Sequence, residues 1–195
     1  MLLVVGLGNP GERYKKNRHN IGWMAVDAIL TACDFGPERR RFHGLVSEGR
    51  LAGGRATTLK PTTLMNLSGQ AVTAAMRYYR LAPRDVVVFH DELDLIPGKV
   101  RVKQGGGNAG HRGLISIDSH IGKDYRRIRL GIGHPGHKAR VNRHVLGDFA
   151  KSDAGWRNAL LKAIAEAAPM LALGDDAGFQ NKVAMLAPPP NSAAS

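Results

Sequence analysis

The chain opens with the stretch LLVVGLGNPG at residues 2–11, and this stretch decides how the rest of the sequence is interpreted. Its first four residues are all apolar, which is typical of a strand buried on both faces of a sheet. Glycines end the apolar run, and Asn9 then places a polar amide just beyond it. In open α/β sheets, ligands bind outside the carboxyl ends of the strands. The opening therefore predicts a central strand that leads into a binding crevice.

The remaining sequence alternates strand-like and helix-like segments. Apolar runs and two-residue alternation predict further strands at residues 45–51, 56–60, 86–89, 99–103 and 127–132. Apolar residues at helical spacing predict helices at residues 21–30, 68–82, 114–121 and 152–173. This alternation predicts an α/β fold in a single compact domain, with a mixed, mostly parallel twisted sheet flanked by helices.

Local signals set the expected boundaries of these elements. Gly53 and Gly54 separate two of the strands and predict a hairpin. Ser68 is expected to N-cap the helix that follows it. Pro169 is expected to kink or shorten the last helix. The strand at 99–103 alternates apolar with basic residues, which predicts a half-exposed position near an edge of the sheet.

The length of 195 residues suits one domain with a sizeable core. We place this domain at residues 1–186, and we expect residues 187–195, which are proline and small residues, to form a disordered tail. No apolar run approaches the ~18 residues that a membrane span needs, and the opening strand leaves no room for a targeting segment. The one cysteine, Cys33, excludes an intramolecular disulfide and fits a cytoplasmic location.

The charge balance narrows the class of partner. Lys and Arg number 28 against 16 acidic residues, which gives a net charge of +12. Such a surplus favours binding to a polyanion, either a nucleic acid or an anionic membrane surface. No basic amphipathic helix is evident, which argues against a membrane. An ordinary solvated basic surface remains the alternative. The basic residues recur in clusters, namely Lys15, Lys16 and Arg18; Arg39 to Arg41; Arg126, Arg127 and Arg129; and Lys138, Arg140 and Arg143.

Polar side chains follow three of the predicted strands at the point where each strand ends. These are Asn9, Asn66 and Asp91. If the three strands are parallel neighbours, their side chains converge on one crevice. His19 lies just before the first predicted helix, close to the same edge. Taken alone, His19 could be a helix-end residue, and Asp91 could cap a helix or a turn.

Other chemistries fit these residues less well. The glycines at 6, 8 and 11 match the pattern G-x-G-x-x-G of dinucleotide-binding loops. Against that reading, Pro10 interrupts the motif, a charged stretch delays the helix, and Asp27 lies inside a helical pattern. The histidines at 134, 137 and 144 lack the spacing or companions of a metal site. An imidazole, a carboxylate and amide donors remain, and these are the parts for general-base attack by water on a carbonyl.

Six motifs in this order resemble those of bacterial peptidyl-tRNA hydrolases. They are Gly6-Leu-Gly-Asn-Pro-Gly11, Arg18-His-Asn-Ile-Gly22, Pro61-Thr-Thr-Leu-Met-Asn-Leu-Ser-Gly69, His90-Asp-Glu-Leu-Asp94, the glycine loop 105–113 and Arg129-Leu-Gly-Ile-Gly-His-Pro-Gly136. The resemblance runs from about residue 2 to residue 149, whereas the C-terminal helix agrees only in kind. It implies an enzyme of the cytoplasm, usually monomeric, with no metal, no organic cofactor and no obligate protein partner. Such an enzyme cuts the ester between a peptide and the 3′ end of tRNA, and so recycles tRNA from prematurely released peptidyl-tRNA.

The resemblance also implies roles for single residues. His19 would be the general base, Asp91 would hold and polarise its imidazole, and Asn9 and Asn66 would lie at the ester. Binding of the tRNA 3′ end and acceptor stem would involve Tyr14, Leu64, Met65, Asn66, His111 and Arg112. Lys103 and Arg129 would clamp the terminal 5′ phosphate in a notch remote from His19, unless both are ordinary solvated charges.

At two positions the sequence departs from the family pattern, which limits how far the family's residue roles apply to it. The glycine loop usually carries His-Asn, but here it carries His111-Arg112. Arginine donates hydrogen bonds but accepts none, so substrate contacts of that Asn do not transfer directly to Arg112. An aromatic residue is usual where Leu64 stands, and its loss removes a stacking surface for a base. The alternative function is that of a non-catalytic RNA-binding relative, such as an intron-splicing factor.

Overall fold

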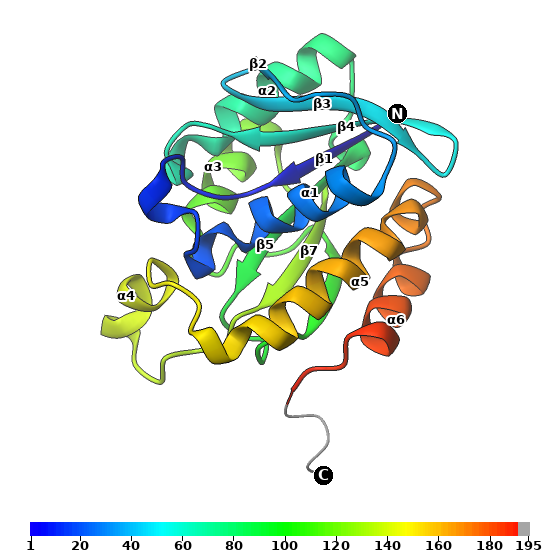
Figure 1. The fold of residues 1–195 in the computed structure, drawn as a ribbon. Helices are drawn as coiled ribbons and strands as arrows, with labels where there is room; N and C mark the ends of the chain where they lie inside the picture. The colour runs from blue at the N-terminus through cyan, green and yellow to red at the C-terminus, as the bar shows by residue number, and fades with distance from the viewer. Residues whose placement is uncertain (191–195) are drawn as a thin grey trace.

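A computed structural model describes residues 1–190 of the chain. Within these residues, seven strands form one twisted sheet in the order β2-β3-β4-β1-β5-β7-β6 (Figure 1). The mixed α/β sheet predicted from the sequence is therefore confirmed. The strands are β1 (Leu2–Gly6), β2 (Arg39–Arg41), β3 (Gly44–Leu51), β4 (Gly54–Pro61), β5 (Val86–Glu92), β6 (Val100–Gln104) and β7 (Arg126–Gly131).

The middle of the sheet is parallel and its edges are antiparallel. Strand β1 pairs in parallel with β4 on one side and with β5 on the other, and β5 pairs in parallel with β7. The hairpin β3–β4, the short strand β2 and the far strand β6 pair antiparallel. Every residue of β1 and β5 is buried, as their apolar runs predicted. Strands β4, β1 and β5 are thus the parallel neighbours that the convergence of Asn9, Asn66 and Asp91 required.

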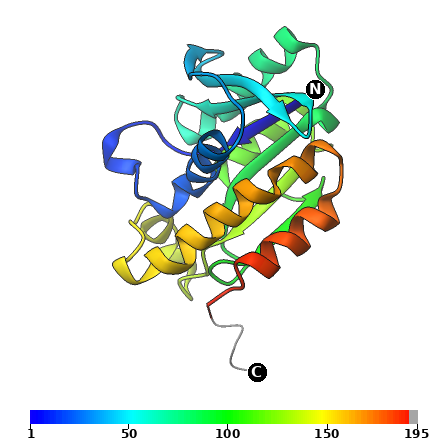
Figure 2. The same ribbon diagram turned by 45° about the vertical axis from the view of Figure 1, so that its right-hand side comes forward.

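Helices cover both faces of the sheet (Figures 1 and 2). On one face lie α1 (Ile21–Ala32), α5 (Ala154–Ala172) and α6 (Asp176–Leu186), packed on Val4 and Phe89. On the other face lie α2 (Ser68–Tyr79) and α3 (Arg112–Ile121), packed on Val5 and Val88. Alternate residues of the same strands therefore feed two cores, which is the pattern expected of a strand buried on both faces.

The C-terminal region departs from its prediction in two ways. Helix α5 continues through Pro169 as far as Ala172, and a further helix, α6, follows it. Proline has no N–H to donate to the carbonyl four residues earlier, that of Ala165. Here the thiol of Cys33, at the end of α1, donates to that carbonyl over 3.9 Å. The chain then turns at Gly174, where φ is +75°, before α6 begins.

Two further predictions need correction. Ser68 is the first residue of α2 and not its N-cap, because the short turn η3 (Met65–Leu67) leads into the helix without a break. The hydroxyl of Ser68 instead donates to the carbonyl of Met65 at 2.8 Å. Strand β5 extends to Glu92, three residues beyond the predicted end, so Asp91 belongs to the strand itself.

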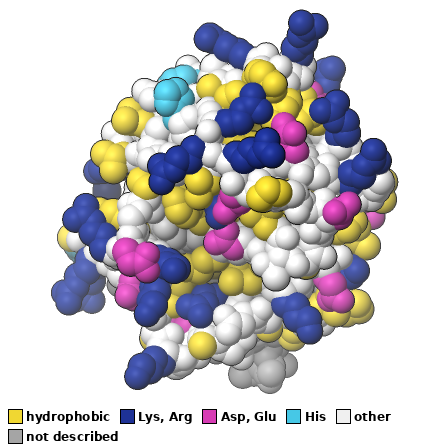
Figure 3. Space-filling model, turned by 45° about the horizontal axis from the view of Figure 1, so that its top comes forward, with side chains coloured by type: hydrophobic (Ala, Val, Ile, Leu, Met, Phe, Trp, Pro, Cys, Tyr) yellow, Lys and Arg dark blue, Asp and Glu magenta, His cyan; other side chains and the backbone are white. Residues whose placement is uncertain are grey.

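The last part of the described chain packs on the domain. Ala187, just after α6, is 6% exposed. Residues 191–195 of the expected tail lie outside the described residues, and the domain boundary at residue 186 stays a prediction. Within residues 1–190, no helix has both the length and the apolar character required to cross a bilayer. Figure 3 looks onto the β2 end of the domain, where Lys and Arg side chains outnumber acidic ones around exposed hydrophobic groups.

Candidate active site

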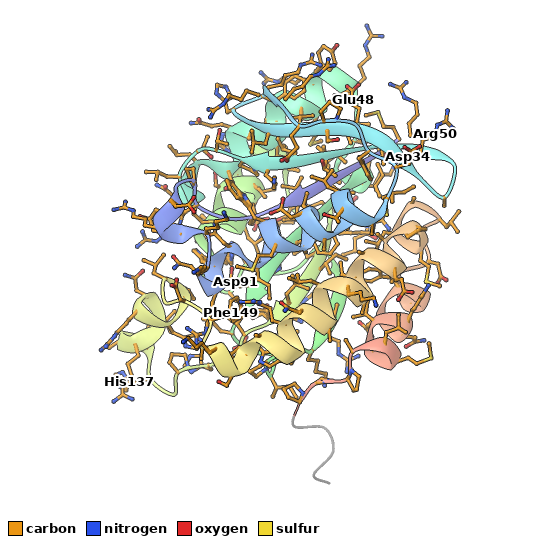
Figure 4. All side chains as sticks on the ribbon, viewed as in Figure 1. Asp34, Glu48, Arg50, Asp91, His137 and Phe149 are labelled. Carbon is orange, nitrogen blue, oxygen red and sulfur yellow. The ribbon has the colours of Figure 1, made fainter. Side chains whose placement is uncertain are left out.

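A pocket of about 470 Å³ opens at the carboxyl edge of the parallel strands. Its wall includes His19, Asp91, His111 and Arg112. Asp91 lies under the turn that leads into α1, near the start of α5 (Figure 4). The pocket therefore lies at the carboxyl end of β5, whereas Asn9 and Asn66, which follow β1 and β4, are not among its lining residues.

His19 reaches Asp91 because α1 packs unusually close to the sheet. His19 lies in the short turn η2 (Arg18–Asn20), which runs directly into α1. A Cβ atom at Gly22 would lie only 2.3 Å from the carbonyl oxygen of Phe89, so only glycine allows this approach. The His19 Nδ1 atom lies 2.8 and 3.0 Å from the two carboxylate oxygens of Asp91. The two residues form a buried imidazole–carboxylate couple, with exposed fractions of 9% and 4%.

Contact between His19 and Asp91 shifts the pKa of both side chains. Burial lowers the pKa of His19, but the charge and hydrogen bond of Asp91 outweigh it, so the pKa is raised above 6.5; the Arg112 charge opposes this rise. Burial alone would raise the pKa of Asp91. The charges and hydrogen bonds of His19 and His111 instead hold that pKa well below its usual value. Asp91 is therefore an anion, and His19 gives up its proton less readily than a free imidazole.

A second imidazole binds the same carboxylate. His111 N-caps α3, since its Nδ1 atom accepts from the backbone N–H groups of Gly113 at 3.1 Å and Leu114 at 3.4 Å. An Nδ1 atom that accepts carries no proton, so in the neutral ring the proton is assigned to Nε2. The Nε2 atom lies 3.0 Å from Asp91 Oδ1 and donates to it. The sequence named His111 only as a substrate contact, and this second role was missed.

His19, Asp91 and His111 have the composition of a metal site. Their three ligand atoms lie within 4.8 Å of one another, and two imidazoles with a carboxylate suit a transition metal. To bind a metal through Nε2, neutral His111 would have to move its proton to Nδ1. There the proton would face the N–H groups of Gly113 and Leu114 and break the cap. The hydrogen bonds therefore favour a cluster that holds protons.

His90 packs behind this cluster as a neutral ring. It is 2% exposed, and its Nδ1–H donates to the carbonyl of Asp91 at 2.8 Å. Burial, followed by the neighbouring His111, lowers the pKa of His90 to about 3. Its ring meets that of His111 edge to face, with 5.2 Å between centroids. His90 thus supports His111 without adding charge beside Asp91.

Asn9 is oriented by hydrogen bonds on three sides. Its side-chain oxygen accepts from the N–H of Met65 at 2.9 Å, which leaves the amide NH₂ group to donate elsewhere. Its backbone N–H donates to the Asn20 side chain at 3.0 Å, and its carbonyl accepts from Asn20 at 2.9 Å. Asn20, next to His19, was not singled out from the sequence. The Asn9–Met65 contact joins the end of β1 to that of β4, where Asn66 stands exposed.

The other predicted tRNA contacts, Tyr14, Leu64 and Met65, are not among the residues that line this pocket. Leu64 is 56% exposed, whereas its neighbour Met65 is buried. Tyr14 is half-buried, and the guanidinium of Arg13 lies 4.5 Å from its ring centroid. Across the pocket, part of the wall comes from Lys138 and from three residues of α4 (Val141–Val145), namely Val141, Asn142 and Val145; the sequence indicated this segment only as a basic cluster.

Lys103 and Arg129 line a second pocket, of about 320 Å³. They come from β6 and β7, whose pairing sets Lys103 opposite Arg127 and Arg101 opposite Arg129. The Nε atom of Arg129 donates to the buried Glu92 at 2.9 Å, so this notch contains an acid that the sequence did not indicate. Both pockets share lining residues, Glu92 among them. The two pockets therefore adjoin each other at the end of β5 and at the glycine loop.

A mixed α/β sheet with an imidazole–carboxylate couple and amide donors at its carboxyl edge defines a domain equipped for general-base chemistry. The family model for peptidyl-tRNA hydrolase matches residues 3–190, and the chain belongs to this family. A peptidyl-tRNA hydrolase of Cereibacter sphaeroides is 62% identical over 190 residues, which are 97% of this chain and 84% of the relative. One from Parvibaculum lavamentivorans is 62% identical over 94% of this chain and 90% of its own length.

Solved structures agree with this assignment. The crystal structure of peptidyl-tRNA hydrolase from Acinetobacter baumannii superimposes with a TM-score of 0.90 at 37% identity, covering 96% of each chain. The family resemblance drawn from the six sequence motifs is therefore confirmed, and so is the fold.

Proposed function

We propose that this chain hydrolyses the ester bond between a peptide, or an N-acylated amino acid, and the 3′ end of tRNA. The observation that carries the proposal is the buried His19–Asp91 couple, 2.8 Å apart in an open pocket, in a chain of the peptidyl-tRNA hydrolase family. The products are a free peptide and a tRNA that can be charged again. Because this substrate arises during translation, we place the activity in the cytoplasm.

In this mechanism His19 acts as the general base. With Nδ1–H donating to Asp91, the Nε2 atom takes a proton from water as the water oxygen attacks the ester carbonyl. The imidazolium formed is stabilised by the Asp91 anion. The tetrahedral intermediate then collapses, and the 3′ oxygen of the tRNA leaves with the proton that His19 held. General-base help contributes roughly 10²–10⁴-fold.

The amides of Asn9 and Asn66 supply the donors for the ester oxygen. The side-chain oxygen of Asn9 is engaged by Met65, so its NH₂ group is the part that can face a developing oxyanion. One such donor contributes about 10²–10³-fold. An ester is an activated substrate, so base and donors together suffice without a covalent nucleophile.

Phosphate and base contacts position the tRNA around this centre. Lys103 and Arg129 hold the 5′ phosphate, and Arg129 is kept in place by Glu92. Tyr14, Leu64 and Met65 flank the path of the 3′ end, while Arg112 adds a cation to the pocket wall. The couple and its amide donors all come from one chain, which supports action as a monomer.

Release of N-acylated amino acid from acyl-tRNA by the purified chain tests this proposal. We expect multiple turnovers, and a fall in turnover of at least ~10²-fold after His19→Ala. The non-catalytic RNA-binding alternative predicts tRNA binding without release. It is not favoured, because a binding module has no need for a buried base held against an ionised carboxylate.

A further inference from the structure

Two side-chain hydrogen bonds hold residues 107 and 108 of the glycine loop between β6 and α3. The Nη1 atom of Arg127 donates to the carbonyl of Gly107 at 2.6 Å. The side-chain NH₂ of Asn108 donates to Asp118 Oδ2, on α3, at 3.1 Å. Several glycines of the loop have positive φ, among them Gly105 at +66° and Gly106 at +90°, which leaves the free loop many conformations. These ties therefore select one of them.

Both ties lead back to the carboxylate of Asp118. Its Oδ1 atom accepts from Arg127 Nη2 at 2.9 Å and from the Tyr125 hydroxyl at 2.8 Å. The side chains of Arg127 and Asp118 are only 2% and 8% exposed. An ion pair buried this deeply contributes little net stability compared with apolar residues of similar size. Its value lies in holding several groups in a fixed arrangement, as the ties to the loop indicate.

From Asp118 a continuous path of hydrogen bonds leads to the reaction centre. The carbonyl of Asn108 accepts from the N–H of His111 at 2.8 Å, and its side-chain oxygen accepts from the N–H of Gly110 at 3.2 Å. His111 Nε2 then donates to Asp91 at 3.0 Å. Asp118 lines neither pocket, so any effect on the reaction passes through the residues that it holds, Asn108 in the loop and Arg127 on β7.

We propose that Asp118 is a positioning residue, which fixes the hydrogen bond of His111 to Asp91 through Asn108. The inference rests on the proposed function. The bond from His111 draws charge from the carboxylate that His19 also uses, so it moderates how strongly Asp91 holds a proton on His19. Losing that bond leaves Asp91 a stronger partner of His19.

The pH profile gives the signature of this role. His19 must be neutral to act as a base, so kcat/KM rises with pH through its pKa. When the bond from His111 is lost, Asp91 favours the imidazolium more, the pKa of His19 rises, and the ascending limb moves to higher pH. The charged groups facing His19 are Asp91, His111 and Arg112 and, around the pocket, Glu92, Asp94, His134 and Lys138. Apart from His111→Ala, no variant below alters them.

The test uses Asp118→Asn and Asn108→Ala in the full chain, assayed as kcat/KM against pH. Asn108→Ala removes the hydrogen bond between Asn108 and Asp118 but leaves the buried Arg127–Asp118 pair intact. It therefore still tests the proposal if Asp118→Asn does not fold. We expect a loss of about ten- to 10²-fold near neutral pH, as for a small misplacement of a reacting group, with the ascending limb moved upward. Asp176→Ala is the matched control, because it removes the partner of Arg126 on the same strand, 2.8 Å away, without contacting the loop.

A double-mutant cycle distinguishes an effect that passes through His111 from a general destabilisation of the domain. In a His111→Ala background, Asn108→Ala should move the profile no further. An unchanged profile in the single variants, a shift equal to that of Asp176→Ala, or a full further shift in the His111→Ala background would each overturn the inference. The proposed function fails separately, if the unaltered chain releases no acyl group or if the turnover of His19→Ala stays close to that of the unaltered chain.

Discussion

His19 and Asp91 acquire their chemistry from neighbours distant in the sequence. Asp91 accepts from two imidazoles, and this double contact keeps it ionised although it is 4% exposed. The sequence predicted that Asn9, Asn66 and Asp91 lie at one edge of the sheet, because the carboxyl ends of neighbouring parallel strands lie at the same edge. The tautomer of His111 did not follow, because it depends on a backbone cap formed only when the glycine loop folds.

Replacing His19 by Ala removes the base and leaves the fold intact. We expect kcat to fall by at least ~10²-fold, measured by acyl release under saturating substrate, while circular dichroism stays unchanged. Turnover close to that of the unaltered chain would remove His19 from the mechanism.

Replacing Asp91 by Asn keeps the shape but removes the charge that raises the pKa of His19. The pKa of His19 should then fall, so the ascending limb of the kcat/KM profile should move to lower pH. Turnover should also drop, because the developing imidazolium loses its counter-ion. An unmoved profile with near-normal turnover would assign Asp91 a structural role only. The shift is opposite in sign to that expected for Asn108→Ala, so the two variants cross-check each other.

Among the elements, helix α6 shows where sequence patterns are weakest. The longer strands and helices were predicted to within a few residues, because continuous apolar runs and helical spacing are strong signals, whereas the short strand β2 and helices α4 and α6 were not predicted. Helix α6 buries only Phe179 and Val183, too few positions to produce a clear stripe. Its start is marked instead by Asp175, whose side chain accepts from the N–H of Gly178 at 2.8 Å. That capping residue was the signal that could have revealed the helix.

Phe179 anchors α6 to the sheet and offers a test at this scale. Its ring meets that of Phe89 edge to face, with 6.4 Å between centroids, and it is fully buried. Phe179→Ala should lower the free energy of unfolding by about 3–5 kcal/mol, measured by denaturant titration. Met185→Ala, at a position on the same helix that is 73% exposed, is the control and should change little. Equal effects of the two variants would contradict the packing described here.

For the whole molecule, composition gives the net charge but does not show where the charged side chains lie. The net charge of +12 indicated a polyanionic partner before any fold was known. Composition could not show that Arg127 is buried against Asp118, or that Arg129 is paired with Glu92. Such pairing depends on the tertiary fold, which brings Arg127 of β7 to Asp118 of α3 and Arg129 of β7 to Glu92 of β5. Part of the basic surplus thus serves the fold, and the exposed remainder faces solvent (Figure 3).

The phosphate clamp is tested by Lys103→Ala combined with Arg129→Ala. Each lost phosphate contact should reduce the salt slope of tRNA binding by about 0.7–0.9. KM for peptidyl-tRNA should rise, while a minimal acylated nucleotide should be cut at an unchanged rate. Arg50→Ala is the control, since Arg50 lies at the far end of the sheet from Asp91 (Figure 4). Equal losses on full and minimal substrates, or no loss on either, would refute the clamp.

The contact between Cys33 and the carbonyl that Pro169 leaves without its helical donor makes a natural reporter of local opening. The chain has one thiol, and burial raises its pKa, so little reactive thiolate forms while α1 stays docked on α5. Cys33 is half-buried in the closed domain, and a transient separation of these helices exposes its sulfur further to an alkylating reagent. Conditions that favour opening of this part of the domain should therefore raise the labelling rate of the unaltered chain. This measurement needs no engineered cysteine, and Cys33 lies at the end of α1 opposite to His19.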